Sequence, residues 1–83
     1  TATADPFSYF VQAGAFRSAD EAESQRAKLA LQGFDARVSE REQSGRTVFR
    51  VRIGPLESRE EAERTQQKLA ASKVDAALVR VQR

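Results

Sequence analysis

The sequence predicts an α+β fold of the ferredoxin-like, split-βαβ class: a four-stranded antiparallel sheet with two helices on one face, in the order βαββαβ. The first observation is an internal repeat at an offset of forty residues, which places Val11 on Val51 and Gly14 on Gly54. The second is that each repeat has alternating apolar runs at its two ends and a helix-capping pattern between them. Two copies are too few for a solenoid, so we expect one compact domain with internal two-fold pseudo-symmetry.

Four segments alternate between apolar and polar residues, as strands do. We expect strands over residues 7–13, 35–41, 47–53 and 75–81. The side chains expected to face the core are Tyr9, Val11, Ala13, Ala36, Val38, Phe49, Val51, Ile53, Ala76 and Leu78. Gly14 and Gly54 are predicted to end the first and third strands, and residues 43–46 to form a hairpin turn between the second and third.

Each predicted helix begins at a capping box, in which a serine is followed three positions later by a glutamate. These boxes are Ser18–Glu21 and Ser58–Glu61, and they predict helices over residues 19–32 and 59–72. The inner stripes predicted from helical spacing are Ala22, Arg26, Leu29 and Ala30, and then Ala62, Leu69 and Ala70. Gly33 is the expected stop of the first helix, because the residue beyond the last turn often has a positive φ.

The domain organisation follows from these elements. Residues 1–6 are small and polar and are expected to form a linker or a disordered N-terminal end, while residues 7–83 form a single domain. Right-handed crossovers place both helices on one face of the sheet and make the first and third strands central. The opposite face is therefore open, and it is the surface on which function is expected.

Composition narrows the function classes. The 83 residues carry a formal charge of +2 and contain neither cysteine nor histidine. The usual nucleophiles, the general base that works near neutral pH and the commonest transition-metal ligands are therefore missing, so we expect a non-enzyme with no cofactor and no metal. There is no apolar run long enough to span a membrane, and any export address is expected to lie outside these residues.

The open face gathers six candidate binding residues from three strands. They are Phe10, Gln12, Val48, Arg50, Arg52 and Val79. Arg50 and Arg52 lie two apart on one strand, so both guanidinium groups point the same way and favour an anionic ligand. The alternative is that these arginines pair across strands with acidic residues such as Glu40 or Glu42.

Three stretches resemble the SPOR domain, the sporulation-related repeat of bacterial envelope proteins. They are the strand Tyr-Phe-Val-Gln-Ala-Gly-Ala-Phe, the helix start Ser-Ala-Asp-Glu-Ala-Glu, and the strand Phe-Arg-Val-Arg-Ile-Gly-Pro-Leu, and the resemblance covers about residues 7–81. It implies a non-catalytic module that binds peptidoglycan glycan strands stripped of their stem peptides. It also implies a periplasmic or cell-envelope location, at the division septum.

The resemblance also implies roles for particular residues. By position, Gln12 is the glutamine of the first strand, Arg50 the arginine of the third, and Val79 the apolar contact of the fourth. The sequence departs from the family pattern at Ala15, where the family often has serine, and at Val48, where some members have an aromatic. Phe10 is a candidate to supply the missing stacking surface.

Two other functions fit the same topology. A nucleic-acid-binding domain would use an open sheet with aromatic and basic residues, but the stretch from Gly45 to Phe49 carries one aromatic, on the inward side. A regulatory or oligomerisation domain would pair with a second copy through the sheet or a helix. We expect denuded glycan as the partner, with no nucleic acid, no membrane contact by these residues and a monomeric domain, although the parent protein can carry a membrane anchor elsewhere.

Overall fold

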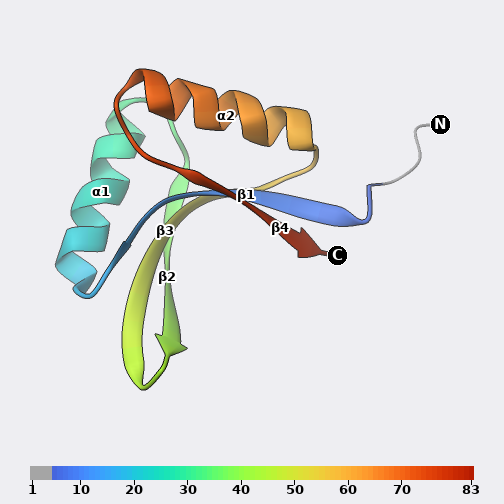
Figure 1. Ribbon diagram of the computed structural model, residues 1–83. Helices are drawn as coiled ribbons and strands as arrows, with labels where there is room; N and C mark the ends of the chain where they lie inside the picture. The colour runs from blue at the N-terminus through green and yellow to red at the C-terminus, as the bar shows by residue number, and fades with distance from the viewer. Residues whose placement is uncertain (1–4) are drawn as a thin grey trace.

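The computed structural model describes residues 5–83 and has the predicted βαββαβ order. The elements are β1 (Phe7–Phe16), α1 (Ala19–Leu31), β2 (Ala36–Gln43), β3 (Arg46–Leu56), α2 (Arg59–Ala71) and β4 (Ala77–Gln82). The four strands form one antiparallel sheet in the order β2-β3-β1-β4, and both helices cover the same face of it (Figure 1). The predicted fold is confirmed, with β1 and β3 in the centre.

The core is built from repeat-related pairs of side chains. The largest fully buried side chains are Leu29 and Leu69 on the helices, and Val11 and Val51 on the central strands. Each member of a pair lies forty residues from the other, so the internal repeat of the sequence reappears in the core. α1 packs on β1, β2 and β3, and α2 packs on β1, β3 and β4, so each helix covers its own half of the sheet.

The central strands are longer than predicted. β1 continues through Gly14 to Phe16 and β3 continues through Gly54 to Leu56, so the prediction that these glycines end the strands was wrong. The register between β1 and β3 shifts twice, between Gln12 and Gly14 and again between Tyr9 and Val11. Such bulges let a strand absorb an extra residue and bend while its pairing resumes, which alternation along one strand does not reveal.

The inner stripes of the helices are narrower than predicted. Ala22 and Leu29 are buried, as are their repeat counterparts, but Ala30 and Ala70 are exposed and Arg26 forms an ion pair with Glu23 on the surface. Two half-buried glutamines face the sheet instead. Gln25 Nε2 donates to the Ala13 carbonyl over 3.1 Å, and Gln66 Nε2 donates to the Ala76 carbonyl over 2.8 Å. The long glutamine side chain reaches main-chain carbonyls that an alanine side chain cannot. Because glutamine is polar, a prediction based on the spacing of apolar residues does not include it.

The predicted caps and the hairpin turn are confirmed. Ser18 Oγ accepts hydrogen bonds from the amides of Asp20 and Glu21, and Ser58 Oγ accepts one from Glu61. The β2–β3 hairpin closes through a two-residue turn, because Gln43 pairs directly with Arg46. The start of each helix and the position of the hairpin turn could be predicted because both depend on interactions between residues close together in the chain.

The start of β1 is fixed by hydrogen bonds to both ends of the described chain. Asp5 accepts from the Phe7 amide and from the Tyr9 hydroxyl, each over 2.9 Å. Arg83 donates from its amide to the Pro6 carbonyl and from Nε to the Phe7 carbonyl, each over 2.9 Å. Of the range 1–6 expected to be a linker, residues 1–4 lie outside the described residues, while Asp5 and Pro6 make these contacts with the domain.

Candidate functional site

All six predicted site residues lie on the helix-free face of the sheet. On β3, Val48, Arg50 and Arg52 alternate with Val51 and Ile53, which are buried beneath the helices. The register then places the remaining residues: Gln12 lies opposite Arg52, and Phe10 lies opposite Val79. The central strands and β4 thus bring these side chains onto one surface.

β2 adds three residues to this surface that were not among the predicted site residues. Arg37 lies opposite Arg52, Ser39 opposite Arg50 and Arg41 opposite Val48. The signal that could have found them is the two-residue turn, because counting outwards from Gln43 and Arg46 fixes every pair of the hairpin. The helix-free face therefore carries four arginines, which are Arg37, Arg41, Arg50 and Arg52.

The register argues against carboxylate pairing of these arginines. Glu40 lies opposite Phe49 and Glu42 opposite Thr47, so both alternate with the arginines of β2 and point to the other side of the sheet. Within residues 5–83 the ion pairs join Arg26 to Glu23 and Arg59 to Glu63, all on helices. The four arginines of the helix-free face thus have no carboxylate partner among the residues that the structure describes.

The arginine cluster is electrostatically unfavourable by itself. Burial lowers the pKa of the Arg52 guanidinium from its ordinary value, and the nearby positive charges of Arg50 and Arg41 lower it further. Arg50 Nε and Ser39 Oγ are both buried and have no hydrogen-bond partner, although their residues face each other across β2 and β3. Unpaired buried polar atoms lower the stability of the folded domain. A bound anion would accept hydrogen bonds from these atoms and would also reduce the repulsion between the arginines.

Phe10 forms the apolar boundary of this cluster. The Arg52 guanidinium carbon lies 4.6 Å from the centre of the Phe10 ring, which is a cation–π arrangement. The ring also lies close against Gly54, where a Cβ atom would be 2.8 Å from Phe10 Cδ1 and 2.8 Å from the Tyr9 carbonyl oxygen. Gly54 is therefore required for this close approach, and the ring and the guanidinium hold each other in place.

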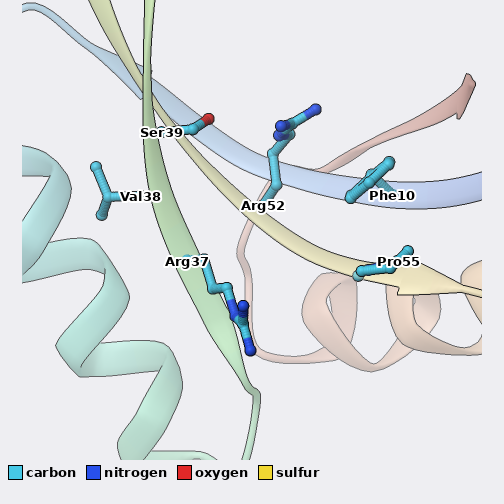
Figure 2. A pocket seen from close by; sticks show the side chains of 7 residues that line it. Phe10, Arg37, Val38, Ser39, Arg52 and Pro55 are labelled. Carbon is cyan, nitrogen blue, oxygen red and sulfur yellow. The ribbon is translucent and has the colours of Figure 1, made fainter.

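A depression of about 270 Å³ opens beside Arg52 on this face. It is lined by Phe10, Arg37, Val38, Ser39, Arg52, Gly54 and Pro55. Figure 2 shows Ser39 and Arg52 projecting from neighbouring strands on the same side, whereas the Val38 side chain points towards α1. The depression thus has a polar wall on β2 and β3 and an apolar wall formed by Phe10 and Pro55.

Metal-ligating clusters and membrane-spanning helices are both absent from residues 5–83. No group of three or more acidic, histidine or cysteine side chains lies close enough together there to hold a metal ion. No helix in this part of the chain has both the length and the apolar character needed to cross a membrane.

The helix-free face of this ferredoxin-like sheet combines four arginines, which have no carboxylate partner within residues 5–83, with an apolar border formed by Phe10 and Pro55, as the surface of a small binding module would. Residues 5–80 match the family model of the SPOR domain, and the chain belongs to this family. The crystal structure of the RlpA SPOR domain from Pseudomonas aeruginosa is similar, with 32% sequence identity, a TM-score of 0.76, and coverage of 88% of this chain and 99% of that chain. The solution structure of the peptidoglycan binding domain of the B. subtilis cell wall lytic enzyme CwlC shares 26% identity and a TM-score of 0.78, and covers 98% of each chain.

Proposed function

We propose that this domain binds peptidoglycan through the helix-free face of its sheet and so localises its parent protein to the cell envelope. Membership of the SPOR family supports this function, as does the likeness to a domain described as peptidoglycan binding. The observation that carries the proposal is the set of four arginines without carboxylate partners among residues 5–83. An anionic ligand would offset the charge repulsion on a surface of this kind.

The glycan bound is one whose stem peptides have been removed. Removal of a stem peptide leaves a free lactyl carboxylate on each N-acetylmuramic acid, and a planar guanidinium binds a carboxylate through two parallel hydrogen bonds. Arg50 and Arg52 are the residues proposed for this role, because they lie on one strand face and Arg50 Nε lacks a partner. A stem peptide would remove the carboxylate and collide with the sheet, so selectivity arises from attraction and exclusion together.

The sugar rings would be held by the neutral part of the same face. Gln12 lies between Arg52 on β3 and Ala77 on β4, where its amide can donate to and accept from hydroxyl and acetamido groups. Phe10, Val48 and Val79 are half-buried and would pack on the apolar faces of the rings. The SPOR family resemblance implies binding to septal peptidoglycan, so this specificity would direct the parent protein to the division septum.

The test is a pull-down of the domain on purified peptidoglycan sacculi before and after amidase treatment, with single-stranded RNA as a competitor. We expect binding to increase after amidase treatment and to be unaffected by RNA. Binding that amidase leaves unchanged would contradict the preference for stripped strands. Binding that RNA and modest salt both abolish would favour the nucleic-acid alternative, since contacts to a polyanion weaken steeply with ionic strength.

A further inference from the structure

The two edges of the sheet differ in how they are protected against pairing with another strand. The sheet order makes β2 and β4 the edge strands (Figure 1). β2 carries four charged and exposed side chains, which are Arg37, Glu40, Arg41 and Glu42. β4 has the sequence Ala-Leu-Val-Arg-Val-Gln, in which Arg80 is the one charged residue. Because charged side chains are a usual protection of edge strands, β4 is the less protected edge.

The charge of Arg80 does not shield the outer edge of β4. Its guanidinium carbon lies 4.3 Å from the centre of the Phe7 ring, which belongs to β1. This cation–π contact holds the charge over the neighbouring strand, away from the outer edge. Val79 and Val81 alternate with Arg80 on the helix-free face, and Val81 is 42% exposed. The outer edge of β4 therefore presents an apolar border to a partner strand.

The main chain of β4 has three residues whose hydrogen-bonding groups point outwards. The Arg83 amide donates to the Pro6 carbonyl, and β4 pairs with β1 over its whole length without a register shift. In an antiparallel ladder, residues that bond to the neighbouring strand alternate with residues whose amide and carbonyl point away from it. Counting back from Arg83 places the outward groups on Leu78, Arg80 and Gln82. No strand within residues 5–83 pairs with this edge.

A second copy of β4 fits this edge best in one antiparallel register. Two copies related by a two-fold axis place one residue of β4 opposite itself. An axis at Val79 pairs residues 77–81 of the two strands and an axis at Arg80 pairs residues 78–82, whereas axes further along the strand pair fewer residues. With the axis at Arg80, two like charges lie directly opposite each other, which is unfavourable. With the axis at Val79, two valines face each other and Leu78 exchanges main-chain hydrogen bonds with Arg80 of the second copy.

We propose that the outer edge of β4 is a self-association surface, on which two copies of the domain pair antiparallel with Val79 opposite Val79 of the second copy. The pairing joins two four-stranded sheets into one of eight strands. Because an interface along one short strand is small, the dimer is weak and forms at domain concentrations of about 0.1–1 mM. This surface goes beyond the proposed function, and it replaces the monomeric domain expected from the sequence with a weak dimer.

The dimer would present two copies of the helix-free face on one side. Residues directly opposite each other in a ladder share a face, so both sets of arginines would point the same way. The two β3 strands would lie five strand spacings apart, about 24 Å. A glycan strand long enough to reach both faces would then be held at two sites. This consequence rests on the proposed glycan binding, whereas the pairing itself does not.

The experiment uses single cysteines, because the chain contains none of its own. In the proposed register Val79→Cys places two thiols at a non-hydrogen-bonded pair, where the Cα atoms lie about 4.5 Å apart and a disulfide can form. Arg80→Cys and Val81→Cys report the neighbouring registers, and the control Arg37→Cys reports the edge formed by β2. Each variant is oxidised at the same concentration, and the disulfide-linked dimer is followed on non-reducing gels.

We expect Val79→Cys to form the linked dimer at least about tenfold faster than Arg37→Cys, because pairing raises the effective concentration of the two thiols. As a measurement that needs no variant, the wild-type domain is diluted from about 1 mM while its amide resonances are recorded. The resonances of Leu78, Arg80 and Gln82 should move with concentration, and those of β2 should not. Equal rates for the two cysteine variants, or β4 resonances that do not depend on concentration, would overturn the surface.

The remaining outcomes separate the register, the surface and the proposed function. Faster linkage of Arg80→Cys or Val81→Cys than of Val79→Cys would overturn the register. The oxidised Val79→Cys dimer should bind long stripped glycan strands at least about tenfold more tightly than the reduced protein at low concentration, and short fragments equally. Equal binding of long strands would show that the two faces do not act together. If neither these forms nor the wild-type domain binds glycan, the proposed function is wrong, while the rates of linkage still decide the surface.

Discussion

Ser39 and Arg50 face each other across β2 and β3, and the Oγ of one and the Nε of the other are both buried without a hydrogen-bond partner. Within residues 5–83 no carboxylate pairs with this arginine. The domain therefore retains a locally unfavourable arrangement in the middle of its open face. Such an arrangement is typical of a binding site that a ligand completes.

Replacement of Arg50 should raise the stability of the domain and lower its affinity for glycan. In Arg50→Met the chain keeps a long apolar stem but loses the unpartnered Nε and its repulsion of Arg52, so we expect the free energy of unfolding to rise by about 1 kcal/mol. Affinity for stripped glycan should fall at least about tenfold. Urea unfolding and glycan pull-down measure the two effects. Arg41→Met is the control and should give no comparable gain in stability; a loss of stability in Arg50→Met would contradict the argument.

Gln12 should contribute to binding but little to folding. It lies at the centre of the helix-free face, opposite Arg52 on one side and Ala77 on the other. We expect Gln12→Ala to reduce glycan affinity about fivefold, the value of one or two neutral hydrogen bonds, with an unchanged melting temperature. Gln82→Ala is the matched control, because Gln82 is exposed on β4 opposite Phe7. Equal losses in both variants would remove Gln12 from the site.

The residues that follow the two helices both have a positive φ, but one is glycine and the other is lysine. Gly33 and Lys73 occupy the same position of the two repeats, with φ of 92° and 62°, and each amide donates to a carbonyl in the last turn of its helix. A positive φ strains lysine but not glycine. We expect Lys73→Gly to stabilise the domain by about 0.5 kcal/mol, and Gly33→Lys to destabilise it by a similar amount. Thermal or urea unfolding checks both, and changes of the same sign would refute the explanation.

The pair formed by Asp5 and Tyr9 should make stability depend on pH at both extremes. The Phe7 amide and the Tyr9 hydroxyl lower the pKa of Asp5 below its usual 3.8, so this contribution is present above pH 3.8 and is lost as pH falls through the lower, folded-state pKa. The hydrogen bond to Asp5 raises the pKa of Tyr9 above its usual 10.0, so its contribution is present below pH 10 and is lost as pH rises through the folded-state pKa.

Two conservative variants test this linkage, and because Asp5 and Tyr9 share one hydrogen bond, each variant also affects the other limb. Tyr9→Phe should abolish the alkaline loss of stability, because the ring remains and the ionising hydroxyl is gone. Asp5→Asn should reduce the acid loss relative to the wild type while other carboxylates continue to titrate. Urea unfolding between about pH 2 and pH 11 measures both. A Tyr9→Phe domain with the wild-type alkaline limb would show that a different group is responsible.

Much of the site could be predicted because strands alternate. Once Val51 and Ile53 are assigned to the core, Arg50 and Arg52 must lie on the other face, and the same reasoning places Gln12 beside Val11. The positions of Arg37, Ser39 and Arg41 could also have been predicted, because the two-residue hairpin turn fixes the register of β2 and β3. Their glycan-binding roles, like those of the six predicted residues, stay predictions that the proposed experiments address.

By itself, the sequence determined the repeat, the helix starts at Ser18 and Ser58, the hairpin turn and the face on which each strand residue lies, because these depend on interactions between near neighbours in the chain. Only the tertiary structure decided how β1 pairs with β3, since their contacts join residues about forty positions apart and include two bulges. That pairing carries both strands through Gly14 and Gly54. It also places Phe10 against Gly54 and beneath Arg52, and so creates the depression that no local pattern predicts.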